Sequence, residues 1–286
     1  MQQRITTAIF FAAAMLGGVY GGAIPFYVLF IVVAVGCLWE LTGILFTVGT
    51  EYRLFRRAMG IVAGILPVIL YGAKIIFRQE ESIVPLFPAD NHLVTTIVLI
   101  EVFLFFTLFI VELFLSSAQP FHQIGHYLTG VMYVGVPYAM LIQIAFLTGD
   151  YGPHRVFGIL WLVWTNDSVA YFTGSKIGKN KLLERISPKK TWEGTLGGVV
   201  GTLLMAWLLS QYIFEYTPVQ WLAVGMVAAV FGSFGDLVES MLKRSAGIKD
   251  SGTLFPGHGG FLDRFDAFQF AVPFAWAGLM VAKWFI

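Results

Sequence analysis

The sequence contains few charged residues and almost no cysteine. Charged side chains make up only 12% of the 286 residues, whereas a soluble domain carries roughly twice that fraction. Hydrophobic residues make up 57% and the mean hydropathy is +0.77, so a membrane protein is indicated. The single Cys37 lies in an apolar run, which excludes a disulfide framework within the chain and predicts a small buried side chain. The formal net charge is only +1, and we expect no nucleic-acid partner.

Long apolar runs fill most of the chain. A run of about 20 apolar residues is long enough to cross the hydrocarbon core of a bilayer as a helix. Such runs occupy residues 5–20, 24–46, 58–77, 93–115, 127–147, 156–174, 194–213, 219–241 and 265–285. The predicted fold class is therefore all-α, a polytopic integral membrane protein with about nine transmembrane helices. We expect one integrated membrane domain, with N-terminal helices in residues 1–150 and a C-terminal region with the main polar loops in residues 151–286.

The basic residues between the apolar runs predict the orientation of the chain. Arginines follow the second run at positions 53, 56 and 57, and a lysine-rich loop follows the sixth run. Because positively charged loops stay on the cytoplasmic side, both loops are predicted to be cytoplasmic. Alternation of the runs then places the N-terminus and the segment Lys243–Arg264 in the cytoplasm and the C-terminus outside. The first run continues into a second, which favours a retained helix over a cleaved signal peptide.

Residues 240–266, SMLKRSAGIKDSGTLFPGHGGFLDRFD, concentrate charge and glycine in an otherwise apolar sequence. The segment holds four cationic side chains, three carboxylates, a histidine and a cluster of glycines: Lys243, Arg244, Lys249 and Arg264; Asp250, Asp263 and Asp266; His258; and Gly257, Gly259 and Gly260. Cations, carboxylates and approachable backbone together suit a polyphosphate held with a divalent metal ion.

Three aspartates are candidate metal ligands. Asp263 and Asp266 are three residues apart and share one face if the last helix begins near them. Asp236 lies in an apolar run, where a carboxylate costs at least about 2.5–3.5 kcal/mol and requires a partner or a hydrated cavity. A helix–loop–helix return can bring it to the same depth, and oxygen ligands predict Mg²⁺, with a second metal ion left open. In the alternative, Asp263 only caps the helix and Asp266 pairs with Arg264 or Lys243.

Two further segments are candidate substrate-binding sites. Asn166 and Asp167 form a polar island in the sixth run. The loop SPKKTWEG ends where a helix is expected to begin, and a helix N-terminus beside lysines favours anions. Its candidate residues are Ser187, Lys189, Lys190, Thr191 and Glu193, with glycines at 194, 197 and 198 that would let the backbone approach a phosphate. The alternative is a positively charged loop that only fixes topology.

Other charged residues embedded in the apolar runs are expected to serve packing or to extend towards the membrane surface. They are Glu40, Lys74, Glu101 and Glu112.

The polar segment also resembles a known family. The residues that carry the resemblance are Ser240, Lys243-Arg244, Lys249-Asp250, Gly252, Pro256, His258-Gly259-Gly260 and Asp263-Arg264-Phe265-Asp266, which are similar to the signature of the phosphatidate cytidylyltransferase (CDP-diacylglycerol synthase) family. A segment similar to SPKKTWEG accompanies that signature in the family. The resemblance implies a nucleotidyltransferase of phospholipid biosynthesis that acts on CTP and phosphatidate, in contact with membrane lipid and in a bacterial inner membrane.

On this interpretation each charged residue has an expected role. Asp236, Asp263 and Asp266 would bind metal, and the four cations Lys243, Arg244, Lys249 and Arg264 would neutralise phosphates. His258, Gly259 and Gly260 would form a backbone cradle, and Asp250 would either bind metal or organise the neighbouring cations.

Two alternatives from the sequence remain open. A related enzyme would use another lipid phosphate. An anion or nucleotide transporter would line its path with Asp167 and Asp236, but the sequence has no convincing internal repeat of the kind that transporters show. The oligomeric state is left open, and a homodimer is one candidate.

Overall fold

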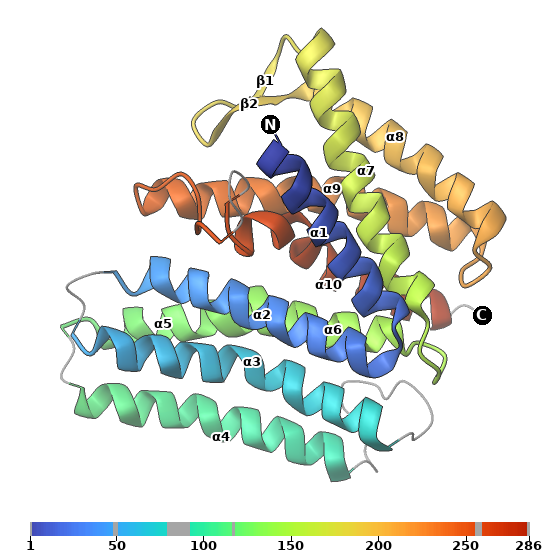
Figure 1. The fold of residues 1–286 in the computed structure, drawn as a ribbon. Helices are drawn as coiled ribbons and strands as arrows, with labels where there is room; N and C mark the ends of the chain where they lie inside the picture. The colour runs from blue at the N-terminus through green and yellow to red at the C-terminus, as the bar shows by residue number, and fades with distance from the viewer. Residues whose placement is uncertain (1, 48–50, 79–91, 116–117, 255–258, 285–286) are drawn as a thin grey trace. The chain divides into compact units, whose positions relative to one another are not determined.

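The structure, a computed structural model, describes residues 2–47, 51–78, 92–115, 118–254 and 259–284, and these are almost entirely helical (Figure 1). The predicted all-α class is confirmed. The helices are α1 (Gln2–Tyr20), α2 (Ala23–Leu45), α3 (Arg53–Arg78), α4 (His92–Phe114), α5 (Pro120–Gly130), a π-helical turn η1 (Val131–Gly135), α6 (Val136–Ala145), α7 (Pro153–Ile177), α8 (Trp192–Tyr212), α9 (Pro218–Ser245) and α10 (Leu262–Trp284).

Seven of the described helices are long and apolar enough to cross a membrane. They span Ala23–Leu45, Arg53–Lys74, Thr96–Phe114, Pro120–Ala145, Trp192–Tyr212, Pro218–Ser245 and Leu262–Ala282. The remaining two predicted runs coincide with α1, whose apolar part is the short stretch Ile9–Tyr20, and with α7, which carries Arg155, Asp167 and Lys176. The protein is thus a multi-pass membrane protein, and the number of nine spans stays a prediction.

The chain divides into two compact units. The first comprises Met1–Tyr151 and Ser251–Leu262, and the second comprises Gly152–Asp250 and Asp263–Ile286. The glycine-rich half of the polar segment therefore belongs to the same unit as the N-terminal helices, although α9 precedes it in the chain.

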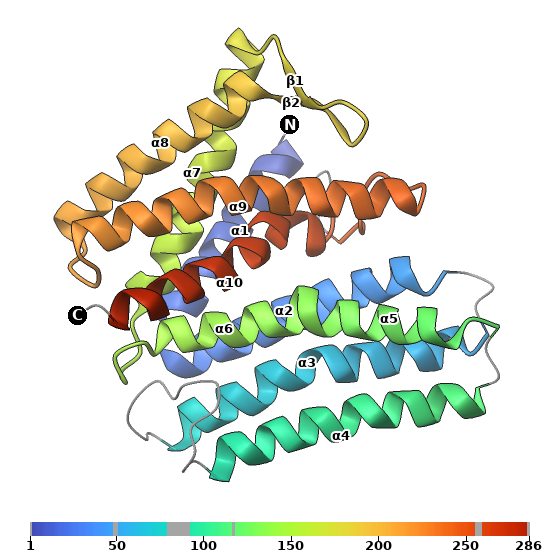
Figure 2. The ribbon, with the colours of Figure 1, turned by 180° about the vertical axis from the view of Figure 1, so that it is seen from behind.

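In the first unit, α3 is the central helix and contacts α2, α4, α5 and α6 (Figures 1 and 2). A buried ion pair joins α3 to α4, with the Arg56 Nη2 atom 2.7 Å from the Glu112 Oε2 atom. The Tyr127 hydroxyl donates to the other Glu112 oxygen at 2.8 Å. Glu112 therefore serves packing, as expected of an embedded charge, and Cys37 is a fully buried small side chain.

In the second unit, α7 packs along α8, and both contact α9. Glycines of α8 make the α7 contact possible, because a Cβ atom at Gly197 would overlap the Thr173 side chain and one at Gly198 would overlap Asn166. Gly194 similarly faces the backbone of α7 at Ala170. These glycines therefore serve helix packing, and their expected approach to a phosphate stays a prediction.

Helices α9 and α10 also meet through small residues. A Cβ atom at Gly235 would overlap the backbone of α10 at Asp266, and the rings of Phe231 and Phe274 stack with centroids 3.6 Å apart. This close approach brings Asp236, the residue after Gly235, beside the first turns of α10.

A short β-hairpin precedes α8. Strands β1 (Lys181–Leu183) and β2 (Ser187–Thr191) are antiparallel, with Lys181 opposite Thr191 and Leu183 opposite Ser187. The Thr191 hydroxyl then caps α8 by accepting a hydrogen bond from the Gly194 N–H at 3.2 Å. The segment predicted only as a loop before a helix is therefore half of a hairpin.

Candidate active site

One face of α9 carries four polar side chains. Asp236, Glu239, Ser240 and Lys243 recur at the spacing of three and four residues that places side chains on one side of a helix. Asp263 and Asp266 occupy the first turns of α10. The structure thus brings together the three aspartates expected from the sequence on two neighbouring helices, and adds Glu239.

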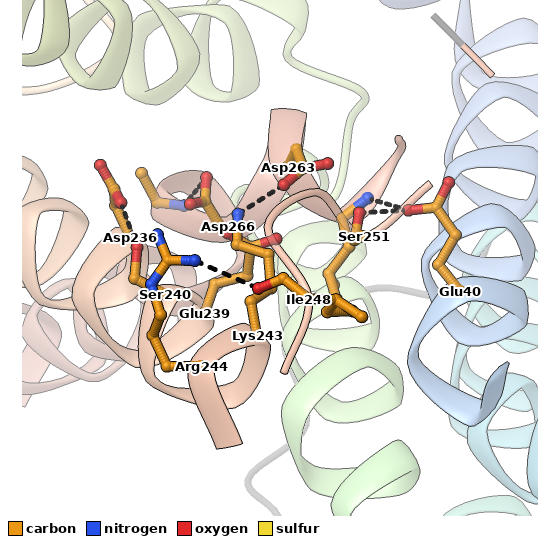
Figure 3. Close-up of polar contacts among 12 residues, drawn as sticks. Glu40, Asp236, Glu239, Ser240, Lys243, Arg244, Ile248, Ser251, Asp263 and Asp266 are labelled. Carbon is orange, nitrogen blue, oxygen red and sulfur yellow. Dashed lines mark hydrogen bonds and ion pairs between the residues drawn. The ribbon is translucent and has the colours of Figure 1, made fainter. Parts of the chain in front are cut away.

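Lys243 connects the two helices. Its ammonium Nζ lies 2.6 Å from the Glu239 Oε2 atom and 2.5 Å from the Asp263 Oδ1 atom (Figure 3). Glu239 is 1% exposed and Lys243 is 9% exposed, so both charges are removed from solvent by the protein itself. The alternative in which Lys243 pairs with Asp266 is wrong, because the ammonium contacts Asp263 instead.

Lys190 brings the hairpin to the same cluster. Its ammonium lies 2.8 Å from the Asp236 Oδ2 atom and donates to the Ser233 carbonyl at 3.2 Å. The Ser240 hydroxyl donates to the other Asp236 oxygen at 3.3 Å. One predicted substrate-binding lysine therefore contacts one predicted metal ligand directly.

The polar island of α7 completes the cluster. The Asn166 side-chain amide donates to the Ser233 hydroxyl at 3.1 Å. Asp167 lies within electrostatic range of Asp236, Lys190 and Arg264. Sequence segments that are more than 60 residues apart thus meet around one set of charges.

The cluster contains more carboxylates than cationic side chains. Asp266 is 8% exposed and lies within electrostatic range of Asp167, Asp236 and Glu239. The Glu239 Oε1 atom is buried and accepts no hydrogen bond from the described part of the chain. Carboxylate oxygens and unbalanced negative charge suit a divalent cation such as Mg²⁺. Among the described residues, however, no three His, Cys, Asp or Glu side chains are grouped closely enough to form a metal site by themselves.

Other predicted residues of the hairpin have structural partners. The Glu193 carboxylate accepts hydrogen bonds from the backbone N–H groups of Lys179 and Asn180, at 3.1 and 3.2 Å, and from the Asn180 side chain at 2.8 Å. It therefore fixes the turn between α7 and β1. Ser187 is half-buried at the start of β2, and Lys189 is exposed.

The remaining predicted cations lie at the surface of the second unit. Arg244, Lys249 and Arg264 are exposed, as is Asp250, and the Arg244 guanidinium donates to the Ile248 carbonyl at 3.1 Å. His258 lies outside the described residues. Gly259 has φ +80°, a conformation that favours glycine.

Gly260, a predicted part of the phosphate cradle, belongs to the first unit and faces Glu40. A Cβ atom at this position would overlap the Glu40 carboxylate. Glu40 was expected only to serve packing or to extend towards the membrane surface, and Glu239 was not among the candidate residues. The spacing of Glu239 from Asp236 was a usable signal, whereas Glu40 had none beyond its place in an apolar run.

The comparison with known proteins identifies the class of this site. The sequence model of the cytidylyltransferase family matches residues 2–282, and the chain belongs to that family. It is a nucleotidyltransferase built on membrane helices.

The chain is 34% identical over 277 residues to a Bacillus subtilis (strain 168) protein named phosphatidate cytidylyltransferase, and the match covers 96% of each chain. Proteins of the same name from Staphylococcus aureus (strain COL) and Staphylococcus haemolyticus (strain JCSC1435) are 40% identical over 148 residues, which is 51% of this chain and 55% of theirs. The family resemblance seen in residues 240–266 is confirmed.

Proposed function

We propose that the protein transfers the cytidylyl group of CTP to phosphatidate and forms CDP-diacylglycerol and pyrophosphate. The observation that supports this most is the cluster of carboxylates and lysines on α9 and α10, within a chain that belongs to the cytidylyltransferase family along nearly its whole length. A polar site on membrane helices is accessible to a lipid headgroup whose acyl chains stay in hydrocarbon.

The transfer forms one bond and breaks one bond. An oxygen of the phosphatidate phosphate attacks the α-phosphorus of CTP, and the bond from that phosphorus to the pyrophosphate oxygen breaks. No covalent enzyme intermediate is needed. Lys190 and Lys243 neutralise phosphate charge, while Asp236 and Asp263 hold these ammonium groups in place at 2.8 and 2.5 Å.

Mg²⁺ is the cofactor we propose, with a second metal ion left open. Asp236, Asp263 and Asp266 would hold it through carboxylate oxygens, together with phosphate oxygens of the substrates, because Mg²⁺ commonly binds one or two carboxylates plus phosphates and keeps several waters. The bound ion supplies charge neutralisation and alignment of the two anions. The buried Glu239 Oε1 atom, which accepts no hydrogen bond from the described residues, and the excess of carboxylates support a cation at this cluster.

We also propose that the hairpin and the residues after α9 face the cytoplasm of a bacterial cell, in the inner membrane. Their lysines and arginines follow the rule that positively charged loops stay inside. This orientation gives the site access to CTP.

Radiolabelled CTP tests the proposal directly. Purified protein in detergent, given CTP labelled in its cytidine, phosphatidate and Mg²⁺, should transfer the label into a lipid that organic solvent extracts. One pyrophosphate should be released for each labelled lipid formed. Omission of phosphatidate is the control for CTP hydrolysis. If label crosses a reconstituted membrane without entering lipid, the protein is a transporter; if only a different lipid phosphate is cytidylylated, the acceptor is reassigned.

A further inference from the structure

The carboxylate of Glu40 in α2 receives three hydrogen bonds from residues that follow α9 in the chain. The Ser251 hydroxyl donates to its Oε2 atom at 2.7 Å, and the backbone N–H groups of Phe261 and Leu262 donate to Oε1 and Oε2 at 2.9 Å each (Figure 3). Glu40 is 9% exposed, so these bonds form largely out of solvent. Hydrogen bonds to an ionised acceptor are roughly twice as strong as neutral ones.

The two ends of the glycine-rich segment, Ser251–Leu262, are therefore fixed to the same side chain. Ser251 begins this segment and Leu262 ends it. Leu262 is also the first residue of α10, where a negative charge is favoured because the N-terminal N–H groups of a helix have no partner within it.

Two glycines of the family signature have their explanation in the same contact. A Cβ atom at Gly252 or at Gly260 would overlap the Glu40 carboxylate. Glycine is thus required at both positions for the carboxylate to approach the backbone. The N–H groups of Phe261 and Leu262, which follow the predicted phosphate cradle, are bound by a protein carboxylate in this structure.

We propose that Glu40 is a positioning residue for cytidylyl transfer: its carboxylate fixes both ends of Ser251–Leu262 and thereby the backbone that leads into Asp263. The proposal rests on the proposed function. Asp263 directly follows Leu262 in the chain and lies in the same helix α10, and its carboxylate pairs with Lys243. Glu40 has no role in binding phosphate, since its charge would repel one.

The first test replaces Glu40 by Gln, which keeps the size but presents an amide N–H₂ to donors and removes the charge. We expect turnover per folded protein to fall between about tenfold and a hundredfold, because small displacements of reacting groups cost that much. The KM for CTP should change much less than kcat. Glu40→Asp, which keeps the charge on a shorter side chain, should recover part of the loss.

Glu101→Gln is the matched control, because it removes another carboxylate embedded in a first-unit helix, and the Glu101 Oε1 atom accepts no hydrogen bond from the described residues. Glu101→Gln should leave turnover unchanged, and it should also leave unchanged the hydrogen exchange of backbone amides near Ser251 and Leu262. In Glu40→Gln, hydrogen exchange of backbone amides in residues 251–254 and 259–262 should increase while the rest of α2 keeps its protection. A normal kcat in folded Glu40→Gln would overturn the proposal, as would a loss explained entirely by a smaller folded fraction.

The second test asks whether Gly260 is glycine because of Glu40 or because of substrate. Gly260→Ala should lower turnover severely in the wild-type background and much less in Glu40→Ala, where the overlapping carboxylate is gone. Equal effects in both backgrounds would show that Gly260 contacts substrate, and the proposal would fail.

Hydrogen exchange separates the positioning role of Glu40 from the proposed transfer reaction. If the wild-type protein makes no cytidylylated lipid at all, the proposed function fails. Increased hydrogen exchange of residues 251–254 and 259–262 in Glu40→Gln would still show that Glu40 holds the segment, and no increase would refute that contact whatever the reaction is.

Discussion

The Lys243 ammonium contacts two carboxylates, so its effect on a bound phosphate depends on both of them. With Glu239 at 2.6 Å and Asp263 at 2.5 Å, the ammonium already has two carboxylate partners, which hold it in place for a phosphate. Removal of one partner from a buried ion pair is far more costly than removal of an exposed charge. The aspartate and the lysine therefore act as one group, and substitution of either is expected to disturb both.

Asp263→Asn should lower turnover by about a hundredfold or more, the usual effect of removing a group that stabilises transition-state charge. Asn keeps the size of the side chain but removes the negative charge that orders Lys243 and, on our proposal, Mg²⁺. Asp236→Asn should behave similarly, since Asp236 pairs with Lys190 at 2.8 Å.

Transfer assays over a range of Mg²⁺ concentrations check both Asn variants, with size-exclusion profiles as the control for folding. Near-normal turnover of either variant at saturating Mg²⁺ would contradict the metal proposal.

Substitution of the two neighbouring lysines of β2 should have different kinetic effects. Lys190 contacts Asp236, so Lys190→Gln should lower kcat as well as raise the CTP requirement. Lys189 is exposed, and Lys189→Gln should raise the KM for CTP by no more than about fivefold, the equivalent of an exposed charge contact worth up to about 1 kcal/mol.

Two-substrate kinetics distinguish these outcomes for the lysines. A defect confined to phosphatidate in both variants would reassign the hairpin to the lipid headgroup.

At the residue level, the sequence pointed to Asp236 because a carboxylate in an apolar run requires a partner, and to Asp263 and Asp266 because they are three residues apart. The structure brings these three aspartates close together, and their role as metal ligands stays a prediction. The roles of Thr191 and Glu193 could not be predicted in the same way: one caps α8 and the other holds the α7–β1 turn, and both depend on a hairpin that the sequence pattern did not reveal.

At the scale of elements, the site depends on how closely α9 and α10 approach. Gly235 faces the α10 backbone at Asp266 without space for a Cβ atom. Gly235→Ala should therefore destabilise the protein by about 1–3 kcal/mol, the typical cost of overpacking, and should lower turnover by displacing Asp236.

Gly278→Ala in α10 is the matched control, because a Cβ atom there meets no described atom within 4 Å. It should leave stability unchanged or raise it by about 0.5–1 kcal/mol, since alanine favours a helix over glycine. Thermal unfolding in detergent measures both variants, and equal unfolding temperatures would disprove the tight contact.

Helices were predictable and their partners were not. Every predicted apolar run coincides with helix because the run itself satisfies the length and composition that a bilayer imposes. The sequence of the hairpin is short and polar, and it therefore resembles the sequence of an ordinary loop. The contact of Glu40 with Ser251 joins residues 211 positions apart, a separation that no local pattern encodes.

At the scale of the whole molecule, the proposed orientation can be tested by labelling. In a Cys37→Ser background, single cysteines at Glu184 in the hairpin and at Thr253 should resist an impermeant thiol reagent in intact cells and react after permeabilisation. A cysteine at Phe214, between α8 and α9, should react from outside.

Labelling of each cysteine in denaturant is the control for burial within a folded protein. Reaction of the Glu184 or Thr253 positions in intact cells would reverse the proposed topology.

The contact between Glu40 and Ser251–Leu262 has a consequence for biosynthesis. A ribosome that adds about 5–20 residues per second needs roughly 10–40 s to reach Ser251 after it has made Glu40. During that interval the N-terminal helices carry a carboxylate that lacks its three donors. A chain that ends before Ser251 leaves the Glu40 carboxylate without these donors, and we expect membrane proteases to degrade such a chain faster for that reason. Pulse–chase half-lives of chains ending at residue 245 should accordingly lengthen with Glu40→Gln, whereas the full-length protein should gain nothing from the same change.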